Sequence, residues 1–173
     1  MGCALEATQQ DARSAGTVDD VELICRAAYS PFHFKKGKIQ ASIIKANDLF
    51  AGTLSVWRAS EKANCSVQDV AGICAALAPK ENTTELRALT AQRIRAAARP
   101  DIGGRLFCVV DETDTDDQGG SHPAHAHIKV CSGVLAGAVD TNDPKFQIAK
   151  SELAFLLRQS DAKVVSAPTP PVS

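Results

Sequence analysis

Apolar positions that alternate with polar ones, or that form a short continuous run, predict β-strands in four segments of the chain. These segments are residues 21–27, 53–59, 105–111 and 127–134. In the second of them, Leu54 and Val56 fall on one side of an extended chain and Trp57 falls on the other. Pro31 follows the first segment and interrupts its extended pattern. The pattern predicts a mixed or mainly antiparallel sheet of about four strands.

Two further segments carry apolar residues at helical spacing. In residues 66–78 the apolar face consists of Val67, Val70, Ile73, Cys74 and Leu77. Ser66 stands at the N-cap position of this helix and Pro79 ends it. In residues 144–158 the apolar stripe consists of Phe146, Ala149, Leu153, Leu156 and Leu157. Pro144 suits the first turn of that helix because its missing N–H has no intrahelical partner there.

Residues 84–98 allow two interpretations. Their leucines and alanines favour one helix by propensity, and a short strand followed by a helical turn is the alternative. With the other elements, they predict one α+β domain over residues 18–159, with two or three helices on one face of the sheet. Asn47, Asp48 and Gly52 are interpreted as a loop. Residues 1–17 and 160–173 are predicted to be disordered tails, the second because it is rich in proline.

Charge and cysteine usage narrow the class of protein. The chain of 173 residues carries 19 basic and 20 acidic residues, a net charge of −1, which argues against attachment to nucleic acid or membrane by bulk charge. No apolar stretch approaches the ~20 residues of a membrane span. No pair among the six cysteines has CxxC spacing. Cys25, Cys74, Cys108 and Cys131 are interpreted as buried, reduced thiols, so we expect a cytoplasmic protein.

A histidine cluster is the first candidate site. It spans residues 122–127 and holds His122, His125 and His127. Alternation places His125 and His127 on one side of a strand, where both imidazoles could bind one divalent metal ion. The competing interpretation is a loop-to-strand junction in which the histidines make structural hydrogen bonds. No cofactor is otherwise expected.

Two opposite charge patches make a second candidate site. An acidic loop occupies residues 112–120, and a basic turn joins Lys35 and Lys36 to Phe32. Lysines beside aromatic rings can hold phosphates and stack bases, which leaves nucleic acid as a lesser alternative partner. Trp57 and Arg58 are candidate binding residues as well, because Trp and Arg are enriched at interface hot spots.

Residues for nucleophilic catalysis are present without a local signature. Ser55, Cys108 and Cys131 could act as nucleophiles, and His33, His122, His125 or His127 as bases. No GxSxG sequence surrounds any of them.

Three patches of the chain carry a resemblance. They are Phe34-Lys35-Lys36-Gly37-Lys38-Ile39, Leu54-Ser55-Val56 and the stretch from His122 to Ile128. Together they resemble small, uncharacterised bacterial proteins with the pattern F-x-x-x-G-x-[IV], L-S-V and P-x-H-A-x-I. The resemblance implies no activity. It favours the strand-then-turn interpretation of residues 84–98, and it singles out His125 within the histidine cluster.

These observations lead to two functional hypotheses. We expect an interaction module, an accessory subunit that acts through a protein partner, because no catalytic motif is evident and the helix over residues 144–158 has a broad apolar stripe. The alternative is a metal-dependent, hydrolase-like enzyme with ligands His125 and His127, in which the metal would acidify a bound water.

Overall fold

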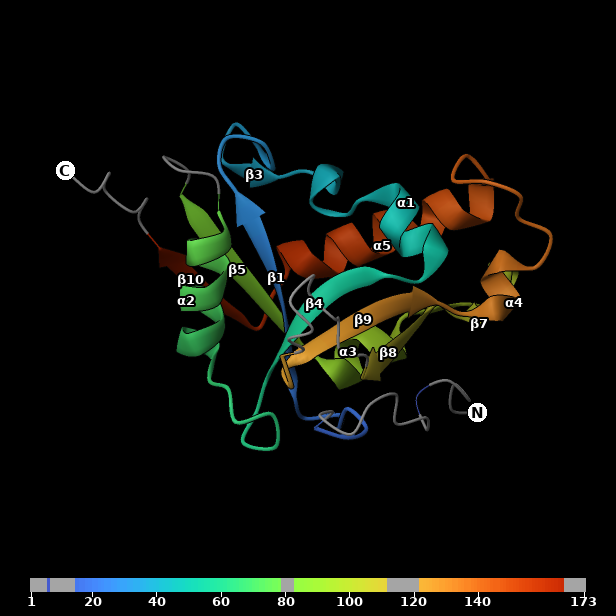
Figure 1. Ribbon diagram of the computed structural model, residues 1–173. Helices are drawn as coiled ribbons and strands as arrows, with labels where there is room; N and C mark the ends of the chain where they lie inside the picture. Colours follow the sequence, from blue (N-terminus) through green and yellow to red (C-terminus); the bar gives the residue numbers. More distant parts are fainter. Residues whose placement is uncertain (1–5, 7–14, 79–82, 112–121, 167–173) are drawn as a thin grey trace.

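The main element of the computed structural model is a six-stranded antiparallel sheet, with strand order β10-β5-β1-β4-β9-β8 (Figure 1). The structure describes residue 6 and residues 15–78, 83–111 and 122–166. The strands of the sheet are β1 (Leu23–Tyr29), β4 (Leu54–Ala59), β5 (Thr84–Thr90), β8 (Phe107–Asp111), β9 (His125–Val130) and β10 (Ala162–Ser166). Two short hairpins lie outside it, β2 (Phe34–Lys35) with β3 (Lys38–Ile39) and β6 (Ala98–Arg99) with β7 (Gly104–Arg105).

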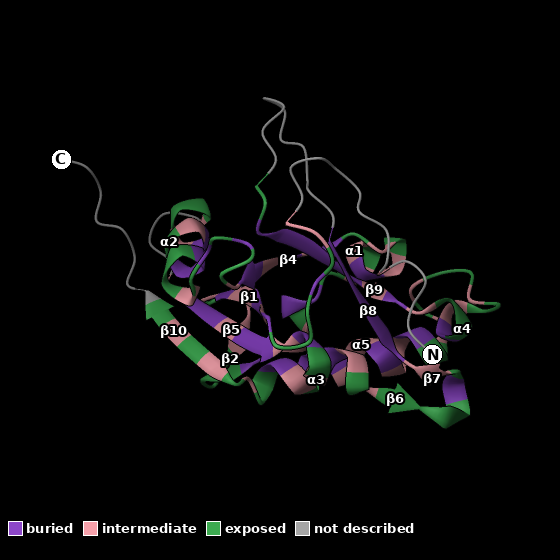
Figure 2. Cartoon of the chain, turned by 90° about the horizontal axis from the view of Figure 1, so that it is seen from below, coloured by how far each residue is buried: buried purple, intermediate pink, exposed green. Residues whose placement is uncertain are grey.

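Helices cover both faces of this sheet. The helices are α1 (Ala46–Ala51), α2 (Val67–Leu77), α3 (Ala91–Ala96), α4 (Ser132–Leu135) and α5 (Pro144–Arg158), with short 3-10 turns at Ala41–Ile43 and Pro100–Ile102. In Figure 2, α2 lies on one side of the sheet, and α3 and α5 lie on the other. Each face therefore has its own core.

The larger core lies between the sheet and α5. Phe146, Ala149, Leu153 and Leu157 of α5 are buried there against inward-facing residues of the strands, as their helical spacing predicts. The smaller core lies under α2, where Val70, Ala71 and Cys74 meet small side chains of β1 and β5. Leu77, predicted to be buried with them, is 68% exposed, because it is the last residue of α2.

Local capping chemistry sets where the two long helices begin. The Ser66 hydroxyl accepts the N–H of Asp69, and the Asp69 carboxylate accepts the N–H of Ser66, which completes a capping box at α2. Asp143 accepts the N–H groups of Lys145 and Phe146 at the start of α5. The predicted start and end of α5 are confirmed, and those of α2 are correct to within one residue.

The α+β class and the antiparallel sheet are confirmed, but two details of the predicted architecture were wrong. The sheet has six strands instead of about four, because β5 and β10 also take part. The helices cover both faces of the sheet instead of one. An apolar stripe shows that a helix packs on the sheet, but it does not show on which face of the sheet the helix lies.

Several local predictions need correction as well. Residues 84–98 form β5 followed by α3, which confirms the strand-then-turn interpretation. The predicted loop around Asn47 is helix α1, which ends at Gly52 in the left-handed conformation (φ 75°) that glycine adopts without strain. The predicted strand 127–134 begins at His125, and α4 occupies its second half. The strand β10 lies in the predicted C-terminal tail, beyond residue 159. Most other residues of both predicted tails, and the acidic loop, lie outside the described residues.

The central pair of strands separates partway along its length. β1 and β4 pair only as far as Cys25 and Trp57. Beyond that point β1 continues beside β5 to Tyr29, whereas β4 continues beside β9 to Leu54. We call the opening between these diverging ends the fork.

Candidate functional site

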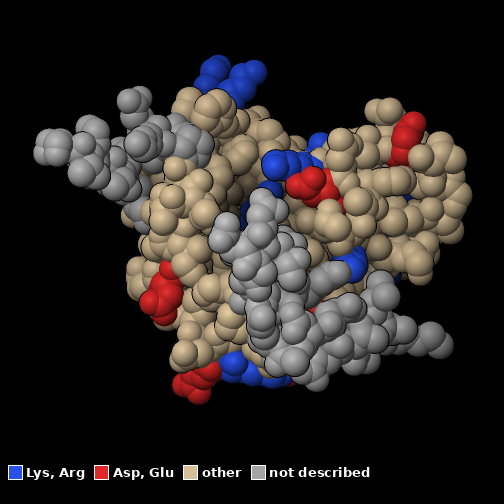
Figure 3. All heavy atoms as spheres, in the orientation of Figure 1, with Lys and Arg blue, Asp and Glu red and all other residues tan. Residues whose placement is uncertain are grey.

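A cleft of about 360 Å³ opens at the fork. Its lining residues come from β1, β4, the end of α2 and the segment between β1 and α1: Arg26, Ala27, Tyr29, Phe32, His33, Lys45, Ser55, Trp57, Cys74 and Leu77. Figure 3 shows the molecule hollowed near its centre, with lysine or arginine atoms in and beside the hollow and an acidic group next to them. We call this site the fork cleft.

Arg26 fills the point at which the strands separate. Its Nη1 donates to the Ser55 carbonyl at 2.5 Å, and its Nε and Nη2 both donate to the Ile43 carbonyl at 3.2 Å. These bonds replace the ladder contacts that β1 and β4 lose at the fork. No described carboxylate lies within ion-pairing distance of this guanidinium. Burial lowers the pKa of Arg26, an effect that the nearby Tyr29 and Asp48 oppose only in part.

Two further groups in the fork cleft can donate to a ligand. His33 Nδ1 accepts the N–H of Tyr29 at 3.0 Å. Burial, together with the charges of Arg26 and Lys45, lowers the pKa of His33. The neutral imidazole then carries its proton on Nε2 and is a donor. Lys45 is 74% exposed, and its Nζ is 3.9 Å from the Asp48 carboxylate, a weak surface ion pair.

A serine–histidine pair lies beside these groups. Ser55 Oγ is 2.5 Å from Nε2 of His125 on the neighbouring strand β9. The ring of His125 makes edge-on contacts with the rings of Trp57 and His127, with ring centroids 5.5 Å and 4.9 Å apart. His125 is 4% exposed, whereas Ser55 is partly exposed and lines the fork cleft. The arrangement is that of a potential nucleophile beside a potential base.

A larger hollow of about 630 Å³ lies between the β2–β3 hairpin and α5. Its arginines are engaged within the protein, since Arg87 pairs with Glu85 and Arg158 donates to the Ile39 carbonyl at 2.9 Å. It contains no pair of chemically reactive side chains among its lining residues. The fork cleft is therefore the stronger candidate site, although it is smaller.

The structure brings some predicted site residues together and separates others. Trp57 and Phe32 both line the fork cleft. Lys35 and Lys36 lie in the exposed β2–β3 hairpin and do not line it. The role of these lysines in nucleic-acid contact remains a prediction.

Arg58 is fully buried and cannot offer a surface for binding, which corrects its predicted role. Its guanidinium donates to both carboxylate oxygens of Glu22, at 2.8 and 2.9 Å, and to Asp111 at 2.5 Å. Both carboxylates are also buried. We call Glu22, Arg58 and Asp111 the buried triad. Sequence alternation places Arg58 on the same side of β4 as Leu54 and Val56, so its burial follows from the strand pattern.

The two carboxyl groups of the buried triad are affected differently. Burial raises the pKa of Glu22, but hydrogen bonds from Arg58, the Asp19 N–H and Ser60 together outweigh it, and the pKa is lowered. For Asp111, burial outweighs the attraction of Arg58, so its pKa is raised.

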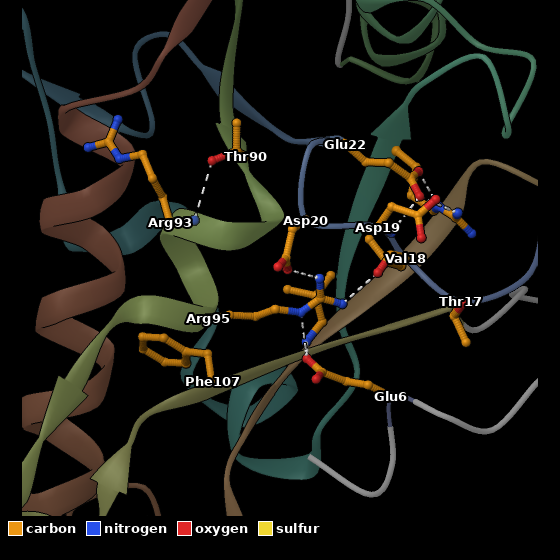
Figure 4. A network of polar contacts seen from close by, with 12 residues as sticks. Glu6, Thr17, Val18, Asp19, Asp20, Glu22, Thr90, Arg93, Arg95 and Phe107 are labelled. Carbon is orange, nitrogen blue, oxygen red and sulfur yellow. Dashed lines mark hydrogen bonds and ion pairs between the residues drawn. The ribbon is translucent and has the colours of Figure 1, made fainter. Parts of the chain in front are cut away.

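A second polar network lies next to the buried triad (Figure 4). Arg95 donates to Glu6 at 3.0 Å, to Asp20 at 2.6 Å and to the Val18 carbonyl at 2.8 Å. The Glu6 carboxylate also accepts Arg105 at 2.6 Å and the N–H of Val109 at 2.8 Å. These contacts tie residue 6 to the edge strand β8.

The metal hypothesis lacks a ligand set in the described part of the chain. His125 and His127 do lie side by side, but no group of three His, Cys, Asp or Glu residues there could hold a metal ion. The described residues therefore supply a histidine pair, which is fewer ligands than a zinc site uses.

The cysteine prediction holds in part. Cys25 and Cys74 are buried free thiols, as expected, and burial raises their pKa values to about 12 and about 11. Cys131 is also a free thiol, but it is only partly buried. Cys108 is disulfide-bonded, so the prediction of a reduced thiol was wrong there. Apolar neighbours in sequence indicate burial, but they do not show which sulfur atoms meet in space.

Comparison of the chain with protein-family models, with curated proteins and with solved structures finds no match. Within the described residues, every helix is too short or too polar to cross a bilayer.

Proposed function

We propose that the protein binds a small organic acid in the fork cleft, with the carboxylate on Arg26. The observation that carries this proposal is a partly buried guanidinium whose partners are backbone carbonyls, at the wall of an open cleft. A buried charge without a countercharge is unfavourable, and an anionic ligand would supply that countercharge.

Arg26 retains the donors for such a ligand. Three of its N–H groups donate to the carbonyls of Ile43 and Ser55. A guanidinium has five N–H donors, so two remain. Lys45 and the Nε2–H of His33 add further positive potential and a further donor to the same cleft. All three groups favour a carboxylate over a cation.

The rim of the fork cleft supports a ligand with an apolar tail. Phe32 and Leu77 are 67% and 68% exposed there, and Trp57 adds an aromatic wall. Large exposed apolar side chains next to a polar floor are typical of ligand sites. The volume of about 360 Å³ suits a small molecule. A medium-length fatty acid such as hexanoate combines both features.

Fluorescence offers a direct test because Trp57 is the single tryptophan of the chain. Hexanoate is expected to change the Trp57 emission in a saturable way, and 1-hexanol, which lacks the charge, is expected to bind far more weakly. Affinity should fall with added salt, since the contact is partly electrostatic. Arg99→Met is the matched control, because Arg99 is an exposed arginine paired with Asp101 outside the fork cleft. Equal binding of hexanoate and 1-hexanol would contradict the proposal.

A second candidate is the expected interaction module, an accessory subunit in the cytoplasm. The exposed Phe32 and Leu77 favour it, because a partner could insert an acidic side chain into the fork cleft and pack an apolar residue on the rim. Peptides that pair Asp or Glu with a neighbouring Leu would then compete with hexanoate in the fluorescence titration. A peptide effect at much lower concentration than hexanoate would favour the protein partner as the natural occupant.

A further inference from the structure

We infer that Ser55 is a nucleophile activated by His125, and that the fork cleft hydrolyses esters by acyl transfer through Ser55. The substrate class, an ester that also carries a carboxylate, rests on the proposed function. The assignment of Ser55 as the nucleophile rests on the serine–histidine geometry alone. The reaction class is carboxylic ester hydrolysis.

The two side chains lie within proton-transfer distance. Ser55 Oγ and His125 Nε2 are 2.5 Å apart, a hydrogen-bond distance suited to general-base activation. They come from adjacent strands, in which Trp57 lies opposite His125 and Ser55 lies opposite His127. Ser55 and His125 are thus diagonal neighbours on one face of the sheet. Strands hold reacting groups more rigidly than loops do.

The surroundings of Ser55 and His125 differ from those of a histidine whose hydrogen bond is only structural. His125 is 4% exposed and its ring makes edge-on contacts with Trp57 and with His127, which limits both its motion and its access to bulk water. Ser55 faces the open cleft. A buried base behind an accessible hydroxyl is what nucleophilic catalysis requires.

Arg26 fixes the backbone of the nucleophile. Its Nη1 donates to the carbonyl of Ser55 itself, so the guanidinium lies next to the residue that would carry the acyl group. Arg26 is therefore assigned as a positioning residue for Ser55 in addition to its role in anion binding.

The reaction proceeds in two balanced steps. In the first, Ser55 Oγ forms a bond with the ester carbonyl carbon, the bond to the leaving alcohol breaks, and the serine proton passes through His125 Nε2 to the alcohol. In the second, His125 takes a proton from water, the hydroxide oxygen bonds to the acyl carbon, and the Oγ–acyl bond breaks. Ser55 regains its proton, and the products are an acid and an alcohol.

A neutral alkyl fluorophosphonate tests the nucleophile without any need for anion binding. Its phosphorus would bond to Ser55 Oγ, the phosphorus–fluorine bond would break, and the serine proton would pass to His125. Intact mass and peptide mapping of the wild-type protein are expected to show a single adduct on the peptide that contains Ser55. Ser55→Ala should abolish this adduct, and Ser151→Ala, which removes an exposed hydroxyl on α5 outside the fork cleft, should retain it.

His125→Gln tests the base. Labelling of Ser55 is expected to slow by about 100-fold, the usual contribution of a general base. His122→Gln is the matched control, since His122 Nδ1 accepts the N–H of Ala124 and is not bonded to Ser55. Circular dichroism of each variant checks that it is folded. An unchanged labelling rate in folded His125→Gln would overturn the role of His125.

The outcomes separate this inference from the proposed function. Hexanoate binding without any adduct on Ser55 would overturn the nucleophile and leave the binding proposal standing. An adduct on Ser55 without hexanoate binding would support the nucleophile and overturn the acid-bearing substrate class. An adduct mapped only to other residues would overturn the inference in the wild-type protein itself, with no variant required.

Discussion

Two arginines on neighbouring strands, Arg58 and Arg26, lie in very different electrostatic surroundings. Arg58 is enclosed with two carboxylates, whereas Arg26 has only carbonyl partners and borders an open cleft. They are close in the sheet, because Ile24 of β1 lies opposite Arg58 and Arg26 is two residues farther along the strand. The contrast separates an arginine that two carboxylates neutralise within the fold from one that has no carboxylate partner among the described residues.

The largest loss of stability is expected from a variant that removes the arginine of the buried triad and keeps its two carboxylates. Arg58→Met leaves the carboxylates of Glu22 and Asp111 buried without their partner, which should lower the free energy of unfolding by about 3–5 kcal/mol. Urea denaturation followed by circular dichroism measures the loss. Arg99→Met removes an exposed ion pair and should cost less than about 1 kcal/mol.

The triple variant Arg58→Met/Glu22→Gln/Asp111→Asn sharpens this test. It leaves no uncompensated charge, so it should be more stable than Arg58→Met alone. A triple variant that is less stable would mean that packing of the arginine, instead of its charge, dominates.

Arg26→Met is expected to have a small effect on stability and a large effect on ligand binding, in contrast to Arg58→Met. The carbonyls of Ile43 and Ser55 lose a donor at the edge of a cleft that water can enter, so stability should fall by only about 1–2 kcal/mol. Hexanoate binding, followed by Trp57 fluorescence, should weaken at least about tenfold. If Arg26→Met lost as much stability as Arg58→Met and kept its affinity, the comparison of the two arginines would be wrong.

The two carboxylates of the buried triad should respond to pH in opposite directions. The lowered pKa of Glu22 means that its ionised form stabilises the fold above its unfolded value of 4.5, and that this contribution is lost as the pH falls through its folded pKa. Glu22→Gln should cost about 2 kcal/mol near neutral pH, and the deficit should shrink in acid.

The raised pKa of Asp111 has the opposite sign. Its protonated form stabilises the fold below the unfolded value of 3.8, and that contribution is lost as the pH rises through the folded pKa. Asp111→Asn should therefore gain stability relative to the wild type as the pH rises. Urea denaturation at a series of pH values between about 3 and 7 measures both slopes. Parallel slopes for the two variants would contradict the assignment.

The smallest effect concerns the wall of the fork cleft. Ser66→Ala removes the N-cap of α2, which supplies Cys74 and Leu77 to the cleft, and should cost about 1 kcal/mol. Hexanoate affinity should stay unchanged, because no binding group is removed. Asp143→Ala, at the equivalent position of α5, is the matched cap variant away from the cleft. A strong loss of affinity in Ser66→Ala alone would mean that α2 controls the shape of the site.

Features with local causes could be predicted from the sequence, and features with distant causes could not. The caps Ser66 and Asp143 act within three residues, so α2 and α5 were placed correctly. The strand β10 is stabilised by pairing with β5, more than 70 positions earlier, and its own sequence resembles a tail. The missed helix α1 likewise depends on the burial of Leu49 in the larger core.

The same reasoning explains what was missed in the site. Ser55 and His125 were both candidates, but 70 positions separate them, and only the register of β4 with β9 brings them together. Arg26 carried a signal that could have been used. It stands between Ile24 and Ala28 at an inward-facing position of an apolar strand. Burial of a charge at such a position is unfavourable unless polar or charged groups compensate it.

The contact of Glu6 with β8 bears on how folded molecules behave toward one another. β8 is an edge strand of the sheet, and an N–H group left without an acceptor on such a strand is a template for pairing with another chain. The Glu6 carboxylate occupies the N–H of Val109 from 103 positions away, and it brings negative charge to that edge. Without Glu6, the Val109 N–H would lose its acceptor at this edge, so the expected consequence is intermolecular β-pairing and aggregation at high concentration.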